Sequence, residues 1–495
     1  MNSFFYTLAI IIMILYTISM LVVLFQSICQ GYLIWKYISA KKQTIIAKNK
    51  ITTYPKVCVQ LPLYNEEYVV ERLINAACNL SYPKDKLEVQ VLDDSTDDSL
   101  QLTKQLVDHW KIEGYDITHV QRSNRKGFKA GALENGLQIT DAKLIAVFDA
   151  DFIPNQNFLL DTVAHFENDK IGMVQTRWGH LNEEYSLLTK LQAFGLNAHF
   201  TIEQSGRAAG GYFFNFNGTA GIWRKQCIVD AGNWHADTLT EDLDLSYRAQ
   251  LKGWQFKYVE ESVQPAELPP AIAAFKSQQY RWMKGGAETA KKHIPSILKA
   301  KLPLGIKFHA VAHLMASTIF FLVFITGLLS VPLLIIKHNM PETALFFKFI
   351  TLFLIGIVVF AVHYFVSCLH THENVKKAIK KFITSTPLFL AFNMGMSFHN
   401  GVAVIEGWMG KKTPFIRTPK FNLSVEKTTW TKNKYVLKSF SWINIVEVLL
   451  LLYFIAGIVL GFYYKDYGLF LYHALLTIGF GMVNFYTVKH SFVKA

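Results

Sequence analysis

The sequence predicts a membrane protein in which an α/β domain lies between transmembrane α-helices. Hydrophobic residues make up 51% of the chain and aromatic residues 14%, and they gather in long apolar blocks typical of membrane proteins. After the first block, short β-rich runs alternate with amphipathic helical stretches. At 495 residues the chain is long enough for this α/β domain and a second domain in the membrane.

The first element is an apolar run over about residues 4–35 that contains no charged side chain. It is long enough to cross a bilayer, and it lacks the basic start and the small-residue cleavage site of a signal peptide. Lysines follow it directly at positions 36, 41, 42, 48 and 50. Because basic residues favour the cytosolic side, we expect residues 1–36 to be a membrane anchor with its amino terminus outside and the next domain in the cytosol.

The second element is the α/β domain, which we place at residues 50–290. Four β-rich runs precede or follow helical stretches: VCVQL (57–61), LEVQVLDD (87–94), ITHVQ (117–121) and KLIAVFDA (143–150). This alternation predicts a largely parallel sheet. In such sheets, ligands bind at the carboxyl ends of the strands.

Carboxylates stand at two of these strand ends. Asp93 and Asp94 end the second run, and Asp149 and Asp151 end the fourth. Side chains two residues apart on an extended segment point to the same side, so Asp149 and Asp151 form a plausible oxygen-ligand pair for Mg²⁺ or Mn²⁺. Helix capping after Asp94 and a solvated acidic turn at 149–151 are the structural alternatives.

Two later segments also carry reactive side chains. Asp242 lies at a helix start in the sequence Thr-Glu-Asp (240–242), where it is well placed to accept a proton from a hydroxyl group, although capping alone also explains the pattern. Gln278, Arg281 and Trp282 share one helix face, where they suit a diphosphate and a sugar ring. Anchoring at the membrane interface is the alternative there.

In this order, Asp94, Asp149-Ala150-Asp151, Asp242 and QQYRW (278–282) resemble the D, DxD, TED, QxxRW series of processive family 2 glycosyltransferases. QLPLYNE (60–66), VLDDSTDDS (91–99), FKAGAL (128–133), FNFNGTAGIWR (214–224) and TEDLDLSYRAQLKGW (240–254) are similar to segments of cellulose-synthase-like A and C proteins and their bacterial relatives. The resemblance covers about residues 55–290. It implies that this domain lies in the cytosol and has a Rossmann-like GT-A fold.

The resemblance also implies roles for individual residues. Asp242 would be the general base, and Asp149 and Asp151 would hold the metal and the diphosphate. The remaining implied residues are Asp93, Asp94 and Lys129 at the nucleotide, and Glu241, Gln278, Arg281 and Trp282 at the acceptor and diphosphate.

The third element, residues 291–495, is expected to be a membrane domain. Four apolar runs suit bilayer spans, at about 308–335, 346–369, 440–463 and 468–488. A fifth run, 387–408, is more polar and lies between two basic segments. If it crossed the membrane, one basic segment would have to lie outside, so we expect an interfacial or re-entrant helix on the cytosolic face.

A basic loop at 411–425 follows that helix. Its sequence FIRTPK resembles the gating loop that cellulose synthases insert over the bound donor. The residues concerned are Phe415, Arg417, Thr418 and Lys420, of which Arg417 and Lys420 suit phosphate contacts. A juxtamembrane loop that holds anionic lipid is the alternative.

The net charge of +13 arises largely beside the apolar blocks, which indicates contact with membrane lipids. No nucleic-acid recognition module accompanies it, so we expect no nucleic-acid partner. The functional hypothesis is an inverting glycosyltransferase that builds and translocates a β-linked polysaccharide, favoured as β-1,4, from a nucleotide sugar of the UDP-glucose or GDP-mannose type. The expected location is a bacterial inner (plasma) membrane or a Golgi membrane. The rivals are a transferase of one sugar to a lipid and a non-catalytic transport or scaffold protein.

Overall fold

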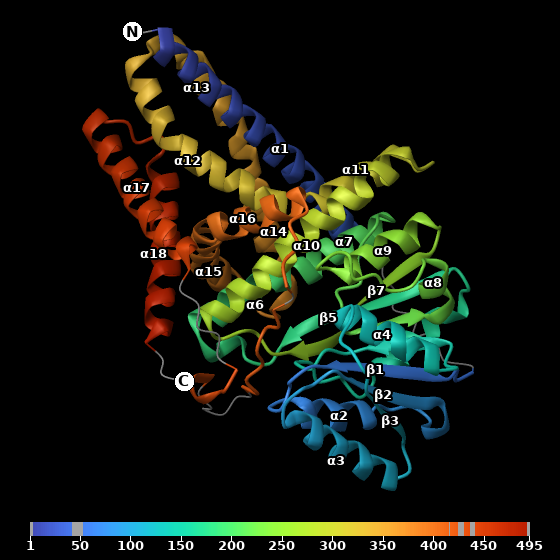
Figure 1. The fold of residues 1–495 in the computed structure, drawn as a ribbon. Helices are drawn as coiled ribbons and strands as arrows, with labels where there is room; N and C mark the ends of the chain where they lie inside the picture. Colours follow the sequence, from blue (N-terminus) through green and yellow to red (C-terminus); the bar gives the residue numbers. More distant parts are fainter. Residues whose placement is uncertain (1–2, 42–52, 415, 424–429, 436–440, 493–495) are drawn as a thin grey trace.

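The computed structural model describes residues 3–41, 53–414, 416–423, 430–435 and 441–492. Figure 1 shows an α/β domain at one end of the molecule and a bundle of long helices at the other, with the long helix α10 (Ile272–Lys299) running between them. This arrangement confirms the predicted fold class.

The α/β domain is built on one 7-stranded sheet of the described residues, in the order β3-β2-β1-β4-β6-β5-β7. The strands are β1 (Val57–Leu63), β2 (Leu87–Asp93), β3 (Asp116–Val120), β4 (Leu144–Val147), β5 (Ile171–His180), β6 (Gly221–Arg224) and β7 (Gln255–Ala266). The four predicted strands are β1 to β4, and they pair in parallel as expected. Only β6 among the described strands runs antiparallel to its neighbours, so the sheet is mixed.

Helices cover both faces of this sheet. One face packs against α2 (Val70–Cys78), α3 (Ser99–Ile112) and α5 (Phe158–Thr162), and the other against α4 (Phe128–Ile139), α8 (Lys225–Asp230) and α9 (Glu241–Leu251). Alternate residues of β4 enter the two apolar cores, with Leu144 and Ala146 on one side and Ile145 and Val147 on the other. Central strands of this kind are apolar along their whole length because both faces are buried.

Further helices connect the sheet to the bundle. They are α6 (Leu187–Ala198), the π-helical turn η4 (His199–Gln204) and α7 (Ser205–Gly210). The described residues also form short 3₁₀ turns, which are η1 (Lys84–Lys86), η2 (Val163–Glu167), η3 (Glu183–Tyr185), η5 (Pro341–Thr343), η6 (Thr351–Phe353) and η7 (Trp430–Lys432). Both α7 and η4 pack against the first helix of the bundle, so the sheet domain and the bundle share an interface.

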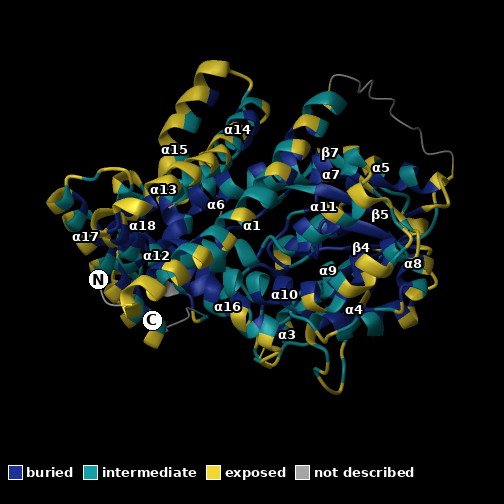
Figure 2. Cartoon of the chain, turned by 90° about the horizontal axis from the view of Figure 1, so that it is seen from above, coloured by how far each residue is buried: buried dark blue, intermediate teal, exposed yellow. Residues whose placement is uncertain are grey.

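The bundle comprises α1 (Ser3–Lys41), α11 (Leu304–Leu314), α12 (Thr318–Asn339), α13 (Ala344–Ile350), α14 (Leu354–Thr371), α15 (Val375–Gly395), α16 (Ser397–Met409), α17 (Trp442–Tyr464) and α18 (Phe470–Ser491). Five stretches of the described residues are long and apolar enough to cross a membrane: 3–41, 318–339, 341–371, 442–464 and 470–491. Figure 2 shows exposed residues along α17, and these include Leu449, Leu452 and Val459. Such exposed apolar helices fit an integral membrane protein.

The residues expected as an interfacial helix, 387–408, are the end of α15 and most of α16, whose axes bend by 49°. Near this bend α15 crosses α18 very closely. A Cβ on Gly395 would stand 2.2 Å from the carbonyl oxygen of Gly479, so only glycine fits the crossing. The run expected at 308–335 is likewise divided between α11 and α12.

Candidate active site

A cavity of about 180 Å³ lies at the carboxyl ends of β1 and β4 and is bordered by α10 and the segment 416–420. Twelve residues singled out in the sequence line it: Asp94, Lys129, Asp149, Asp151, Glu241, Asp242, Gln278, Arg281, Trp282, Arg417, Thr418 and Lys420. Asp93 lies outside the cavity lining, and Phe415 lies outside the described residues. The fold therefore gathers side chains from six separate stretches of sequence at one edge of the sheet.

The neighbouring carboxylates Asp93 and Asp94 point in different directions. Asp93 is buried, with its Oδ2 3.0 Å from Nε2 of His119, while its Oδ1 accepts a hydrogen bond of 2.9 Å from the backbone of Ser95. Asp94 faces the cavity, and Nε of Arg122 donates to its Oδ1 at 2.9 Å. The structure thus holds Asp93 within the turn after β2 and presents Asp94 to a ligand.

Asp149 and Asp151 follow β4, and each is paired with a lysine. The Asp149 Oδ1 lies 2.5 Å from Nζ of Lys129, which comes from the first turn of α4. The Asp151 Oδ2 lies 2.6 Å from Nζ of Lys420. Both carboxylates line the cavity, and their donor atoms are oxygens of the kind that hard divalent cations prefer.

Asp242 lies in the first turn of α9 and projects into the same cavity. Burial, assisted by the adjacent charge of Glu241, raises the pKa of Asp242 to about 7, although Lys129 and the Leu243 backbone amide oppose this shift. Thr240 is the N-cap residue of α9, but its side chain makes no capping hydrogen bond. At neutral pH the Asp242 carboxylate is therefore poised to accept a proton.

Gly218 is packed directly against Asp242 at a positive φ of 80°. A Cβ at this position would stand 3.0 Å from Oδ2 of Asp242 and 3.4 Å from Nζ of Lys129. We expect Gly218→Ala to lower the turnover number at least tenfold, because the methyl group displaces the carboxylate and strains the backbone. Initial rates at saturating donor test this, with Gly253→Ala as the control because it has a similar φ of 94° but nothing within 4 Å of the added Cβ.

The helix α10 supplies Gln278, Arg281 and Trp282 to the opposite wall of the cavity. An Nη2 of Arg281 donates to the hydroxyl of Thr418 at 2.8 Å. Burial lowers the pKa of Arg281, while the nearby carboxylates of Glu241 and Asp149 raise it and partly offset that effect. This wall therefore brings positive charge close to Asp242 and Asp149.

The segment 416–423 lies over the cavity and is fixed by contacts with the sheet domain. Nη1 of Arg417 lies 2.7 Å from Oε2 of Glu66, and the backbone N–H of Phe421 donates to Glu267 at 2.8 Å. Burial raises the pKa of Glu66 to about 7, against the opposing charges of Arg417 and Lys420. Arg417 and Lys420 thus contact protein carboxylates in this structure.

Sequence reasoning did not assign several residues of the cavity, among them Glu66, Tyr64, Arg125 and Trp178. Glu66 and Tyr64 belong to QLPLYNE, which begins inside β1 and ends just beyond it at the ligand edge, and this position was the available signal. Arg125 has no such signal, although its guanidinium lies 3.2 Å from the centre of the Tyr64 ring. Trp178 lies in β5, far from the motifs in the sequence.

Comparisons with known proteins relate the α/β domain to a family of enzymes. Residues 55–285 match the model of glycosyltransferase like family 2. The chain is similar to glucomannan 4-beta-mannosyltransferase 1 of Cyamopsis tetragonoloba, with 42% identity over 280 residues, or 55% of this chain and 53% of that protein. It is also similar to glucomannan 4-beta-mannosyltransferase 7 of Arabidopsis thaliana, with 43% identity over 254 residues, or 50% and 46% of the two chains. The matches span about half the length of these relatives.

Among solved structures, a mannosyltransferase of Pyrobaculum calidifontis, PcManGT, in complex with GDP-Man and Mn²⁺ has a similar fold. The TM-score is 0.51 at 16% identity, and the match covers 80% of this chain and 100% of that one. Together with the mixed sheet, this likeness confirms the expected Rossmann-like GT-A arrangement of the α/β domain.

Proposed function

Residues 55–285 of this chain belong to glycosyltransferase like family 2, and from this membership we propose that the protein is a membrane-embedded, inverting glycosyltransferase. It takes a sugar from a nucleotide-sugar donor and adds it to the end of a β-linked polysaccharide. The observation that carries this proposal is the single cavity in which Asp242 faces the metal-type pair Asp149 and Asp151 and the cations Lys129 and Arg281.

The residues of the cavity fit a divalent cation. Asp149 and Asp151 are two residues apart, line the same cavity and offer only oxygen ligands. Each carboxylate is paired with a lysine ammonium group, Lys129 or Lys420, whose positive charge a metal cation would replace. We assign Mg²⁺ or Mn²⁺ to this pair. When bound there, the cation stabilises negative charge on the departing diphosphate.

The side chains of this protein account for the rest of the transfer. Asp242 accepts the proton of the acceptor hydroxyl, whose oxygen forms a bond to the anomeric carbon. The bond from that carbon to the diphosphate breaks, and the diphosphate leaves with the electron pair. Lys129 and Arg281 stabilise the developing charge most strongly as this bond breaks. A single displacement converts an α-linked donor into a β-linked product.

Names of the similar proteins indicate the sugar. Both relatives described above are 4-beta-mannosyltransferases that act on glucomannan, by their names. We therefore propose a donor of the GDP-mannose type and a β-1,4 bond, with a UDP-glucose type donor as the second choice. Asp94 and Lys129 contact the nucleotide, with Asp93 holding the turn, while Gln278, Trp282 and Glu241 contact the acceptor and the diphosphate.

The helices of the bundle suggest how the protein lies in the membrane. We propose that residues 1–36 anchor the chain with the amino terminus outside, that residues 50–290 lie in the cytosol, and that the four later apolar stretches cross the membrane. The α15–α16 pair stays on the cytosolic face as a re-entrant unit, which keeps the described residues Arg417, Thr418 and Lys420 of the following loop at the donor site. Lipids surround the bundle, and the polymer passes between its helices.

The pKa of Asp242 predicts how activity depends on pH. A general base acts only when it is deprotonated, so kcat/KM should fall about tenfold for each pH unit below about 7 and level off above it. Initial rates at low donor concentration between pH 5 and 9 measure this. Because Glu66 has a similar pKa, Glu66→Gln is the control and should keep the acid limb in place. An acid limb near pH 4 in the parent protein would contradict the assignment of Asp242.

Product analysis tests the proposal as a whole. Purified protein in lipid nanodiscs receives radiolabelled GDP-mannose or UDP-glucose with Mg²⁺ or Mn²⁺, or with a chelator. We expect a long, mannanase-sensitive product that requires the metal and is largest with GDP-mannose. A single sugar on an extractable lipid would replace the polymerase assignment with a non-processive transferase. Donor binding without transfer would indicate a non-catalytic protein.

A further inference from the structure

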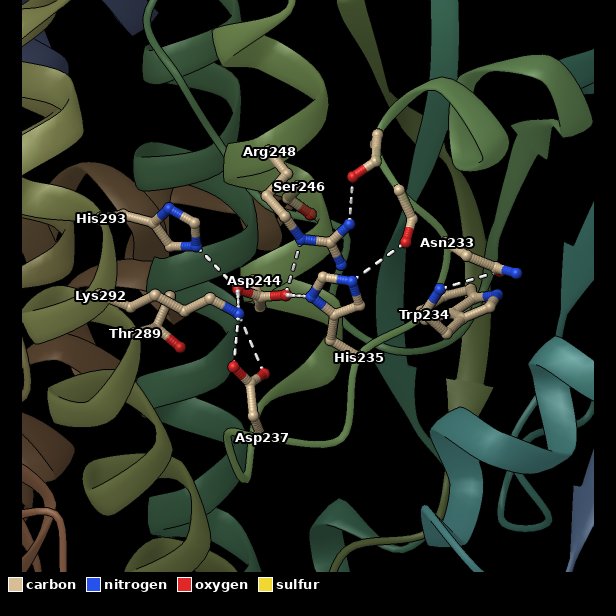
Figure 3. Close-up of polar contacts among 12 residues, drawn as sticks. Asn233, Trp234, His235, Asp237, Asp244, Ser246, Arg248, Thr289, Lys292 and His293 are labelled. Carbon is tan, nitrogen blue, oxygen red and sulfur yellow. Dashed lines mark hydrogen bonds and ion pairs between the residues drawn. The ribbon is translucent and has the colours of Figure 1, made fainter.

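A buried carboxylate lies two residues beyond Asp242 and takes no part in the cavity. Asp244 is fully buried in α9. Figure 3 shows the groups that surround it: Nε of Arg248 at 2.8 Å, Nε2 of His293 at 2.7 Å and Nζ of Lys292 at 2.8 Å. Burial alone would raise the pKa of Asp244, but its bonds to His293, Arg248 and Lys292 outweigh that effect and hold the pKa low, so the carboxylate stays charged.

These contacts tie three segments of the chain together. Arg248 also donates to the carbonyl oxygen of Ala231, at the end of α8. His235, from the following loop, lies 3.8 Å from Asp244. Lys292 also lies 2.8 Å from the half-exposed Asp237. The donor atoms of His235, Asp237 and Asp244 come within 4.8 Å of one another, as in a metal site, but Lys292 already bridges the two carboxylates and balances their charge.

One face of α10 connects this cluster with the active site. Gln278, Arg281 and Trp282 are followed on that face, at steps of three or four residues, by Gly285, Glu288, Thr289, Lys292 and His293. The middle of this face contacts the segment just before Asp242. A Cβ on Gly285 would stand 2.6 Å from Cγ2 of Thr240, and the hydroxyl of Thr289 lies 3.1 Å from that of Thr240.

The backbone of the same segment is held as well, because the N–H of Leu239 donates to Oε2 of Glu288 at 2.8 Å. The start of α9 therefore lies along α10 from Gly285 to His293, and Asp244 is its charged end contact. Moving α10 along its axis or turning it would break these contacts. It would also shift Arg281 relative to Asp242.

We propose that Asp244 is a positioning residue, which fixes the helix that carries Asp242 against the helix that carries Arg281. This inference rests on the proposed transferase function, because Asp244 affects sugar transfer only by holding Asp242 and Arg281 in position. The effect is mechanical. Without the carboxylate, Arg248, Lys292 and His293 lose their common partner, and the two helices lose their fixed register.

The test compares Asp244→Asn with Asp237→Asn, which removes the exposed carboxylate that shares Lys292. We expect Asp244→Asn to lower the turnover number about a hundredfold, with the donor KM within about threefold, because the residues at the strand ends are unaffected. Asp244→Glu should recover part of the loss. Asp237→Asn should stay within about twofold of the parent.

A second readout does not need activity. Spin labels at the exposed positions Lys252, at the end of α9, and Ser296, on α10, report the distance between the two helices. We expect a broader distance distribution in Asp244→Asn than in Asp237→Asn, whether or not the parent protein transfers sugar. A parent protein that transfers no sugar would contradict only the proposed function. A narrow, unchanged distribution in Asp244→Asn with parental turnover would overturn the inference. An equal loss of turnover in Asp244→Asn and Asp237→Asn would also overturn the inference.

Discussion

Asp242→Asn is expected to lower the rate of sugar transfer by about 10²–10⁴-fold, the range that general base catalysis supplies. The amide keeps the shape of the side chain in the first turn of α9 but cannot take the proton of the acceptor hydroxyl. The variant should still bind the donor with nearly parental affinity, because the carboxylate repels the diphosphate rather than holding it. Single-turnover transfer and donor binding by calorimetry measure the two effects separately.

The control is Asp169→Asn, which makes the same chemical change on a fully exposed carboxylate of the same domain. It should transfer sugar at the parental rate. If Asp242→Asn also keeps the parental rate, the base lies elsewhere, and Glu66 is then the first residue to test because it lines the cavity and its pKa is also about 7.

Lys276→Met is expected to destabilise the protein by about 3–5 kcal/mol, which is the usual effect of leaving one partner of a buried ion pair alone. Nζ of Lys276, on α10, lies 2.7 Å and 2.9 Å from the two carboxylate oxygens of Glu447, on α17. Glu447 is completely buried and Lys276 is 8% exposed. The substitution leaves the carboxylate facing apolar helices, so the melting temperature in detergent should fall clearly.

The double variant Lys276→Met/Glu447→Gln separates charge from packing. An amide at 447 can still accept the hydrogen bond that Asn444 donates at 3.2 Å, and no charge remains buried. We expect it to regain most of the lost stability. If the double variant melts as low as Lys276→Met, the pair matters through its shape rather than its charge.

The strands and their reactive ends were accessible from the sequence because the signals are local. Short β-rich runs between helical stretches indicate β1 to β4, and a parallel sheet places the strand ends together, so the closeness of Asp94 and Asp149 could be predicted without the tertiary contacts. The helix period likewise places Arg281 beside Gln278. These residues line the cavity as the patterns indicated.

Contacts between distant segments were not accessible in this way. Capping by Thr240 was the alternative explanation of the Thr-Glu-Asp pattern, but the Thr240 side chain bonds to Thr289 of α10, because the close approach of Gly285 brings the two segments together. No local pattern shows that Lys420 pairs with Asp151, because 269 residues separate them. The same holds for Asp244, which reads as one more acidic residue in a helix start.

The anomeric configuration of the product tests the central claim most directly. Purified protein in nanodiscs is given an α-linked nucleotide sugar, and the new glycosidic bond is followed by NMR in the parent and in Asp242→Asn. A single displacement assisted by Asp242 predicts a β-linked product in the parent and almost none in the variant. An α-linked product, or a β-linked product formed equally fast by the variant, would contradict the mechanism.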